Sequence, residues 1–236
     1  MTTILAIDTA TDACSVALYR NGEYTECYEV VPRSHSQRLL PMLQSLLPSG
    51  DLRAQGVDAI AYGCGPGSFT GLRIAASAVQ GLAYANSIPA ISISTLACQA
   101  QTAVRIGLVK TGESLFSTID ARINEIYWSS FVVRSDSVIE HSGANVCTPG
   151  DLPVLTQESS LVAIGSGLKH LKAMPTELTD SFTSVYPDLL PSARDLVPLA
   201  LAKLTRGETQ RAQNVLPVYV RDEISWKKLS EQGKRA

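Results

Sequence analysis

The sequence is poor in histidine: His35, His141 and His170 are the only three, and none lies three or four residues from another. Two imidazoles need that spacing to share one face of a helix, so the sequence argues against a zinc or iron site built mainly from histidine. The G-x-S-x-G motif of serine hydrolases is also missing, since the stretch around Ser68 reads GPGSFTG. We therefore expect no metal and no catalytic residue.

Disulfide patterns, membrane-length apolar runs and an excess of basic residues are missing as well. The five cysteines are scattered without a C-x-x-C pair, which is typical of a reduced intracellular protein. No basic segment followed by an apolar run opens the chain, and no apolar run is long enough for a membrane span. The net charge of −2 argues against a protein that holds nucleic acid alone. We expect a cytoplasmic protein without a membrane segment.

The residues that are present alternate between strand and helix patterns. Apolar segments at 4–7, 14–19 and 23–30 predict strands, and Asn21-Gly22 is a strong hairpin signal between the last two. Leucines at helical spacing follow, and strands and helices then alternate. This order predicts an α/β fold with mixed sheets flanked by helices. After the first three strands, we expect further strands at 57–62 and 90–93 and helices at 37–47, 70–85 and 95–105.

A faint internal repeat predicts two similarly built lobes. Ile119-Asp120 repeats the Ile7-Asp8 pair at the end of an apolar strand, and a second strand–glycine–helix order occurs around Gly165. We expect an N-terminal, partner-binding lobe over 1–106, a C-terminal lobe over 107–206 and a tail over 207–236. A polar corner at Asp120 and Arg122 is interpreted as an internal ion pair or turn contact.

The stretch GCGPGSFTGLR resembles a phosphate-binding loop but fits neither standard motif. Ser68 stands where the third glycine of G-x-G-x-x-G belongs, and no lysine follows Gly71 as a P-loop requires. The structural interpretation is better supported, because Pro66-Gly67 favours a tight turn and Ser68 or Thr70 can cap the next helix. We expect this loop to pack a helix and not to bind phosphate.

Nucleotide binding remains an alternative at four positions. Asp8 and Thr9 end the first strand, where a carboxylate can orient magnesium or water near phosphates, or can simply bond the turn that follows. Gly165 and Gly167 form the best available partner loop in the second half. With these four residues, the rival function is a free-standing ATP-binding ATPase or kinase.

The expected helices 37–47 and 70–85 carry apolar or small residues around more than one face. A helix of this kind is buried on two sides, and the second side can be covered by the other lobe or by another protein. We favour docking of a partner on this helix pair. The expected contact residues are Leu39, Leu40, Leu43, Leu47, Leu72, Ala75, Ala78, Val79 and Leu82.

The motifs ILAIDTATDACSVAL, HSQRLLPML, GPGSFTGLRIAASAVQGLAYA, IDARINEIYW and PVYVRD together resemble the bacterial TsaB (YeaZ) family. The resemblance implies the two-lobed fold of actin, hexokinase and Hsp70 (the ASKHA fold). It also implies a non-catalytic subunit in the biosynthesis of N6-threonylcarbamoyladenosine (t6A) in tRNA. Such a subunit supports the TsaD transferase together with the TsaE ATPase, forms homodimers when TsaD is absent, and contacts tRNA only indirectly. The resemblance implies no required cofactor, although ATP or ADP could bind at a partner interface.

The sequence departs from the catalytic relatives at one motif. Transferase members of the wider family present H-x-x-x-H for a metal, whereas here His35 is followed four positions later by Leu39. The resemblance therefore implies a relative that lacks the metal chemistry and retains the interface, and a peptidase activity is not expected.

Overall fold

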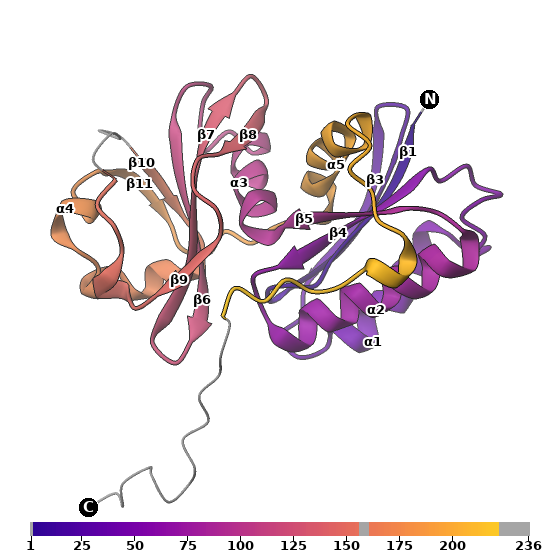
Figure 1. The fold of residues 1–236 in the computed structure, drawn as a ribbon, viewed down its shortest axis with the longest axis horizontal. Coiled ribbons are helices and arrows are strands. Elements are labelled where there is room, and N and C mark those ends of the chain that lie inside the picture. Colours follow the sequence, from indigo (N-terminus) through magenta and orange to yellow (C-terminus); the bar gives the residue numbers. More distant parts are fainter. Residues whose placement is uncertain (1, 156–160, 222–236) are drawn as a thin grey trace, which may run out of the picture.

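The computed structural model describes residues 2–155 and 161–221, so the end of the predicted tail, 222–236, lies outside the described residues. Two mixed sheets with flanking helices form two lobes side by side (Figure 1). This is the α/β, ASKHA-type arrangement expected from the sequence. Within the described residues, none of the helices has the length and apolar character needed to cross a membrane.

The first sheet has the strand order β3-β2-β1-β4-β5. β1 pairs antiparallel with β2, and β2 with β3, through the predicted Asn21-Gly22 hairpin; β4 and β5 are parallel to β1. Asn21 has a φ of 53° and Gly22 a φ of 96°, the positive values that a tight hairpin turn requires. The bounds are β1 Thr3–Asp8, β2 Ala13–Arg20, β3 Glu23–Val30, β4 Ala59–Gly65 and β5 Ala90–Ser94.

The second sheet repeats this order as β8-β7-β6-β10-β11, with β9 added beside β7. Its first three strands are again antiparallel neighbours and its last two run parallel to β6. Asp8 at the end of β1 corresponds to Asp120 near the end of β6, so the predicted duplication is confirmed. The bounds are β6 Ser114–Arg122, β7 Glu125–Arg134, β8 Ser137–Glu140, β9 Asn145–Cys147, β10 Leu161–Ile164 and β11 Phe182–Tyr186.

Two helices are exchanged between the lobes. α3 follows the first sheet in the chain, but its Leu96 and Ala100 belong to the hydrophobic cluster of the second sheet. α5 follows the second sheet and packs Leu196 and Val197 against the first. By sequence α5 falls in the expected 107–206 unit, although it covers the first sheet in space. The helices are α1 His35–Leu46, α2 Phe69–Asn86, α3 Thr95–Arg105, α4 Thr176–Thr179 and α5 Leu196–Thr205.

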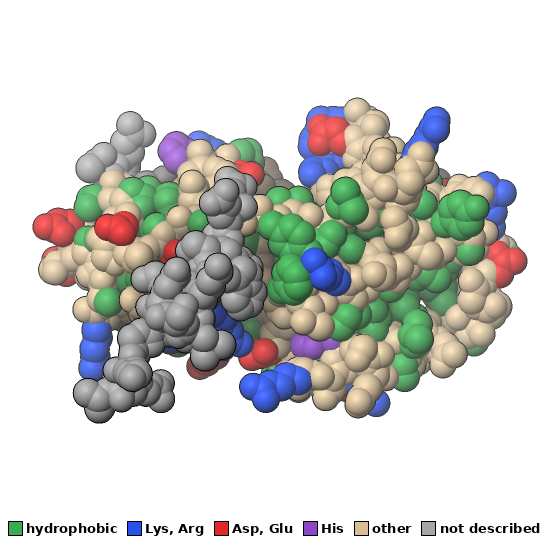
Figure 2. All heavy atoms as spheres, turned by 60° about the horizontal axis from the view of Figure 1, so that its bottom comes forward, with side chains coloured by type: hydrophobic (Ala, Val, Ile, Leu, Met, Phe, Trp, Pro, Cys, Tyr) green, Lys and Arg blue, Asp and Glu red, His purple; other side chains and the backbone are tan. Residues whose placement is uncertain are grey.

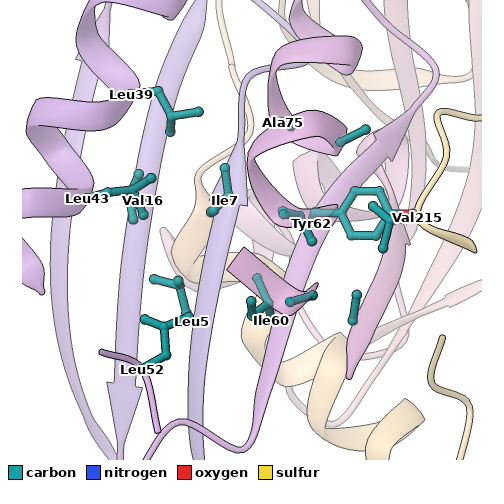
Figure 3. Packing of buried hydrophobic residues seen from close by; sticks show 14 of the residues in the cluster. Leu5, Ile7, Val16, Leu39, Leu43, Leu52, Ile60, Tyr62, Ala75 and Val215 are labelled. Atoms are coloured by element: carbon teal, nitrogen blue, oxygen red, sulfur yellow. The ribbon is translucent and has the colours of Figure 1, made fainter. Parts of the chain in front are cut away.

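The largest core cluster lies between the first sheet and the pair α1 and α2. Side chains alternate along a strand, so Leu5 and Ile7 point toward α1 and α2 while Ile4 and Ala6 point toward α5. Figure 3 shows Leu39 and Leu43 of α1 and Ala75 of α2 directed at the strands. These three side chains are buried within the single chain. The other labelled residues are Leu5, Ile7, Val16, Leu52, Ile60, Tyr62 and Val215.

Candidate functional site

The glycine loop packs against the turn between β1 and β2. A Cβ at Gly63 would overlap the Asp8 carboxylate, and one at Gly71 would overlap the carbonyl oxygen of Thr9. The Ser68 amide donates to the Ala10 carbonyl at 2.7 Å, and Thr9 Oγ1 donates to the Gly71 carbonyl at 2.7 Å. The glycines thus allow close approach of two backbone segments, which confirms the packing interpretation.

The start of α2 is capped as the sequence predicts. Ser68 is the N-cap residue, and its Oγ accepts a hydrogen bond from the Gly71 amide at 3.3 Å. One of the amides that a helix leaves unpaired at its start is therefore satisfied inside the chain.

Asp8 is completely buried, with one carboxylate oxygen satisfied. Its Oδ1 accepts from the Ala10 amide at 3.1 Å, while Oδ2 has no partner among the described residues. Burial raises the pKa of Asp8 to about 7, because a carboxylate removed from water loses its hydration. The hydrogen bond that the sequence interpretation offered for the turn is present; magnesium or nucleotide binding at Asp8 stays a prediction.

Gly165 and Gly167 pack against the second lobe's own sheet. Gly165 has a φ of 96°, and a Cβ there would overlap the Gln99 side chain and the Thr118 carbonyl. A Cβ at Gly167 would press on Ile126 and on Thr118. Packing explains both glycines, and their predicted role in nucleotide binding remains a prediction.

A cleft of about 1390 Å³ lies between the two lobes. Ala10, Thr11 and Ser166, which adjoin the predicted nucleotide residues, contribute to its wall, together with side chains from α1, α2 and the second lobe. The structure thus brings the two candidate loops to one cleft without placing Asp8, Thr9, Gly165 or Gly167 among the residues that line it.

The corner at Asp120 is an ion-pair cluster on the second-lobe wall of this cleft. The Asp120 carboxylate lies 2.5 Å from Lys169 Nζ and 3.6 Å from Arg122 Nη1, and it accepts from the Arg122 amide at 3.2 Å. Partial burial is the largest single influence and raises the pKa of Asp120, but the hydrogen bonds from Lys169, the Arg122 amide and His170, with the charge of Lys169, together hold the pKa below its usual value. The interpretation as an internal ion pair and turn contact is confirmed.

Most of the residues predicted to contact a partner are buried in the core. Leu39, Leu43, Leu47, Leu72, Ala75 and Val79 are all less than a tenth exposed. These six side chains pack in the interior of the chain, because the sheet takes the more apolar side of each helix, and their predicted contact with a partner stays a prediction. Leu40, which is 62% exposed, and the partly exposed Ala78 and Leu82 remain available on the outer side.

The outer side of α1 and α2, which we term the α1–α2 face, is largely apolar and has no acidic side chain from either helix. Leu40, Phe69, Ile74, Ser77 and Ala78 line a groove of about 610 Å³ between the helices. Neither helix contains an acidic residue. Over the first lobe in Figure 2, hydrophobic and uncharged side chains cover most of the surface. Depletion of charge with exposed aromatic residues is typical of the centre of a protein interface.

An exposed aromatic and cationic cluster extends this face at the start of α2. The guanidinium of Arg73 lies 3.8 Å above the centre of the Phe69 ring and donates to the Tyr219 hydroxyl at 3.0 Å. The Phe69 and Tyr219 rings are 5.5 Å apart. The sequence analysis missed this cluster, since Tyr219 is far from α2 in the chain and no local periodicity links them.

The positions that correspond to the metal-binding H-x-x-x-H do not form a metal site. Nε2 of His35 lies 3.2 Å from the Ala13 carbonyl oxygen, and Leu39, at the second position, is a buried core residue. Within residues 2–155 and 161–221, no group of three His, Cys, Asp or Glu side chains could hold a metal ion. The residues present therefore do not fit the metal of the catalytic relatives.

Comparisons of the sequence with known proteins point to one family. Residues 27–226 match the family described as TsaD, tRNA N6-adenosine threonylcarbamoyltransferase. The Escherichia coli protein named tRNA threonylcarbamoyladenosine biosynthesis protein TsaB is 40% identical, over 96% of this chain and 97% of its own. The Haemophilus influenzae protein of the same name is 37% identical over 96% and 97%.

A solved structure described as YeaZ from Pseudomonas aeruginosa superimposes with a TM-score of 0.82 at 40% identity. The superposition covers 93% of this chain and 100% of that one. The similarity therefore extends through both lobes, and the chain belongs to the TsaB (YeaZ) family.

Proposed function

We propose that this protein is a non-catalytic subunit of tRNA t6A biosynthesis that binds the TsaD transferase through the α1–α2 face. Participation in t6A biosynthesis follows the names of relatives that are similar over nearly the whole chain. A supporting role, and not a catalytic one, is favoured by the corner at His35 and Leu39, which is filled by core packing.

The strongest support for a docking surface on α2 comes from Gly81. It lies inside α2, is exposed, and a Cβ added to it would meet no atom within 4 Å. A glycine in a helix costs about 1 kcal/mol relative to alanine, and packing within the described residues gives no reason for that cost. Close approach of a partner's backbone at Gly81 supplies the reason.

Exposed large side chains on the same two helices can act as anchors. Leu40 is 62% exposed on α1, Phe69 is 51% exposed at the start of α2, and Tyr84 is 80% exposed near its end. Aromatic and aliphatic anchors of this kind, set around small residues, contribute most of the binding energy in many interfaces.

The family implies further partners, and one of them, a second copy of the chain, would use the same face. A second copy of the chain can cover it when TsaD is absent, which would hide the exposed apolar residues of the monomer. The TsaE ATPase would join the TsaD complex, with ATP or ADP at a partner interface and tRNA contacted mainly by the partners. These assignments rest on the family alone.

Replacing Ser77 with arginine should abolish the complex with TsaD and leave the fold intact. Ser77 is exposed on α2 and lines the groove, so a charged side chain there would be buried without a partner on docking. The measurement is co-elution with purified TsaD on a sizing column, with light scattering for mass. Ala75, buried in the core, is unsuitable for this test.

The matched control is Ala202→Arg, an exposed position on α5 at the opposite side of the first sheet. This variant should bind like the unmodified protein. A complex formed equally well by Ser77→Arg would move the interface away from the α1–α2 face. Separate elution of the unmodified protein and TsaD, with and without nucleotide and TsaE, would refute the proposed function.

A further inference from the structure

Residues 207–221, which we term the strap, run back along the first lobe after α5 (Figure 1). The strap begins by extending the first sheet: Gln210 exchanges two backbone hydrogen bonds with Ala90 of β5, at 2.8 and 2.9 Å. The Gln210 side chain adds a bond from Nε2 to the Ser92 hydroxyl at 2.7 Å. This end of the strap is therefore fixed to the first lobe.

The middle of the strap is held against β4 and the glycine loop. Val215 is buried in the core cluster, and the Tyr62 hydroxyl donates to the Leu216 carbonyl at 3.2 Å. The Val218 amide donates to the Cys64 carbonyl at 2.7 Å, and the Val218 carbonyl occupies the space into which a side chain at Gly65 would project. The path of the strap is thus specified by buried groups of the first lobe.

The end of the strap reaches the second lobe. Arg221 pairs with the carboxylate of Glu125, and its Nη2 also donates to the Ala121 carbonyl at 3.3 Å. Ala121 and Glu125 flank the hairpin between β6 and β7. Both charged side chains are partly shielded from water, at 19% and 32% exposure, so salt screens this pair less than a fully exposed ion pair.

Arg221 also lines the cleft between the lobes, as does Tyr219. In Figure 1, α3 and α5 connect the lobes in the upper half of the view, and the strap crosses below them. Two lobes joined by exchanged helices can still change their angle, and a bond on another side of the cleft restricts that change.

We propose that the strap fixes the angle between the lobes, with the Arg221–Glu125 pair as its latch, and that docking on the α1–α2 face acts on the latch through Tyr219. The effect of docking on the latch rests on the proposed function. Phe69 and Arg73 line the docking groove and also hold the ring and the hydroxyl of Tyr219. A partner group that engages Arg73 or Phe69 competes with Tyr219, two residues from the latch.

Removing the latch should loosen the lobes in the isolated protein. Glu125→Gln deletes the charge and preserves the size of the side chain. Spin labels carried by unnatural amino acids at the exposed Asp51 and Asn145, one on each lobe, report the distance between the lobes. We expect the distance distribution of the variant to broaden, and amide exchange of residues 216–221 to accelerate by about tenfold.

The matched control is Glu208→Gln, which removes the surface ion pair between Arg206 and Glu208 at the beginning of the strap without touching the second lobe. Its distance distribution should equal that of the unmodified protein. An unchanged distribution in Glu125→Gln, or an equal change in the control, would overturn the latch.

The link to docking is tested by adding TsaD to the unmodified protein and following amide exchange of residues 216–221. Changed exchange in a complex confirmed by its mass supports the link, and unchanged exchange in such a complex refutes it. The absence of any complex would refute the proposed function, and with it the link, while the result on the isolated protein would still decide whether the latch exists.

Discussion

Replacing Gly71 with alanine should lower the free energy of unfolding by about 3 kcal/mol or more, whereas the same change at Gly81 should raise it by up to about 1 kcal/mol. Both glycines lie in α2. A methyl group at Gly71 would overlap the Thr9 carbonyl oxygen, so two backbone segments have to separate. At Gly81 the methyl group meets open space and only reduces the freedom of the unfolded chain.

The measurement is urea denaturation of the two variants beside the unmodified protein under identical conditions. The two variants are controls for each other, because both replace glycine with alanine in the same helix. Equal effects at the two positions would show that Gly71 is not held by the turn after β1. If the α1–α2 face docks a partner, Gly81→Ala should also bind TsaD less tightly despite its greater stability, since the added methyl group stands in the path of approach.

The fold could be predicted largely from local pattern. Alternation in the strands, leucine spacing in α1 and the Asn21-Gly22 turn are all short-range signals, and the structure contains each of them. The duplication was visible through Ile7-Asp8 and Ile119-Asp120, because a buried strand that ends at a carboxylate occurs in both lobes. The exchange of α3 and α5 was not predictable, since a helix pattern shows which side is apolar and not which sheet it covers.

Local patterns do not separate the buried residues of α1 from the exposed ones. Leu39 and Leu40 are neighbours of equal hydrophobicity, but the first is in the core and the second is 62% exposed. A helix that is apolar around most of its circumference gives no sequence signal for the side that the sheet takes. The contacts of the strap could not be predicted for a different reason. They join Tyr219 to α2 and Arg221 to the second lobe, across sequence separations that no periodicity describes.

Asp8→Asn should remove a pH dependence of stability that the unmodified protein has. The folded pKa of Asp8 is about 7, against 3.8 as the ordinary value for the side chain. Below the ordinary value both the folded and the unfolded chain hold the proton, so Asp8 adds no penalty. Between the two values the unfolded chain ionises first and the folded state loses stability; above pH 7 the loss is complete, on the order of 4 kcal/mol.

Between pH 5 and pH 8 the unmodified protein should therefore lose about 3 kcal/mol of unfolding free energy through Asp8 alone. Asparagine preserves the acceptor for the Ala10 amide and cannot ionise, so its denaturation curves should lack that component. The control is Asp12→Asn, which makes the same chemical change at an exposed neighbour outside the core. A profile for Asp8→Asn parallel to that of the unmodified protein would mean that the unpartnered Oδ2 is reached by water or by a cation, which would favour the nucleotide interpretation of this corner over the packing one.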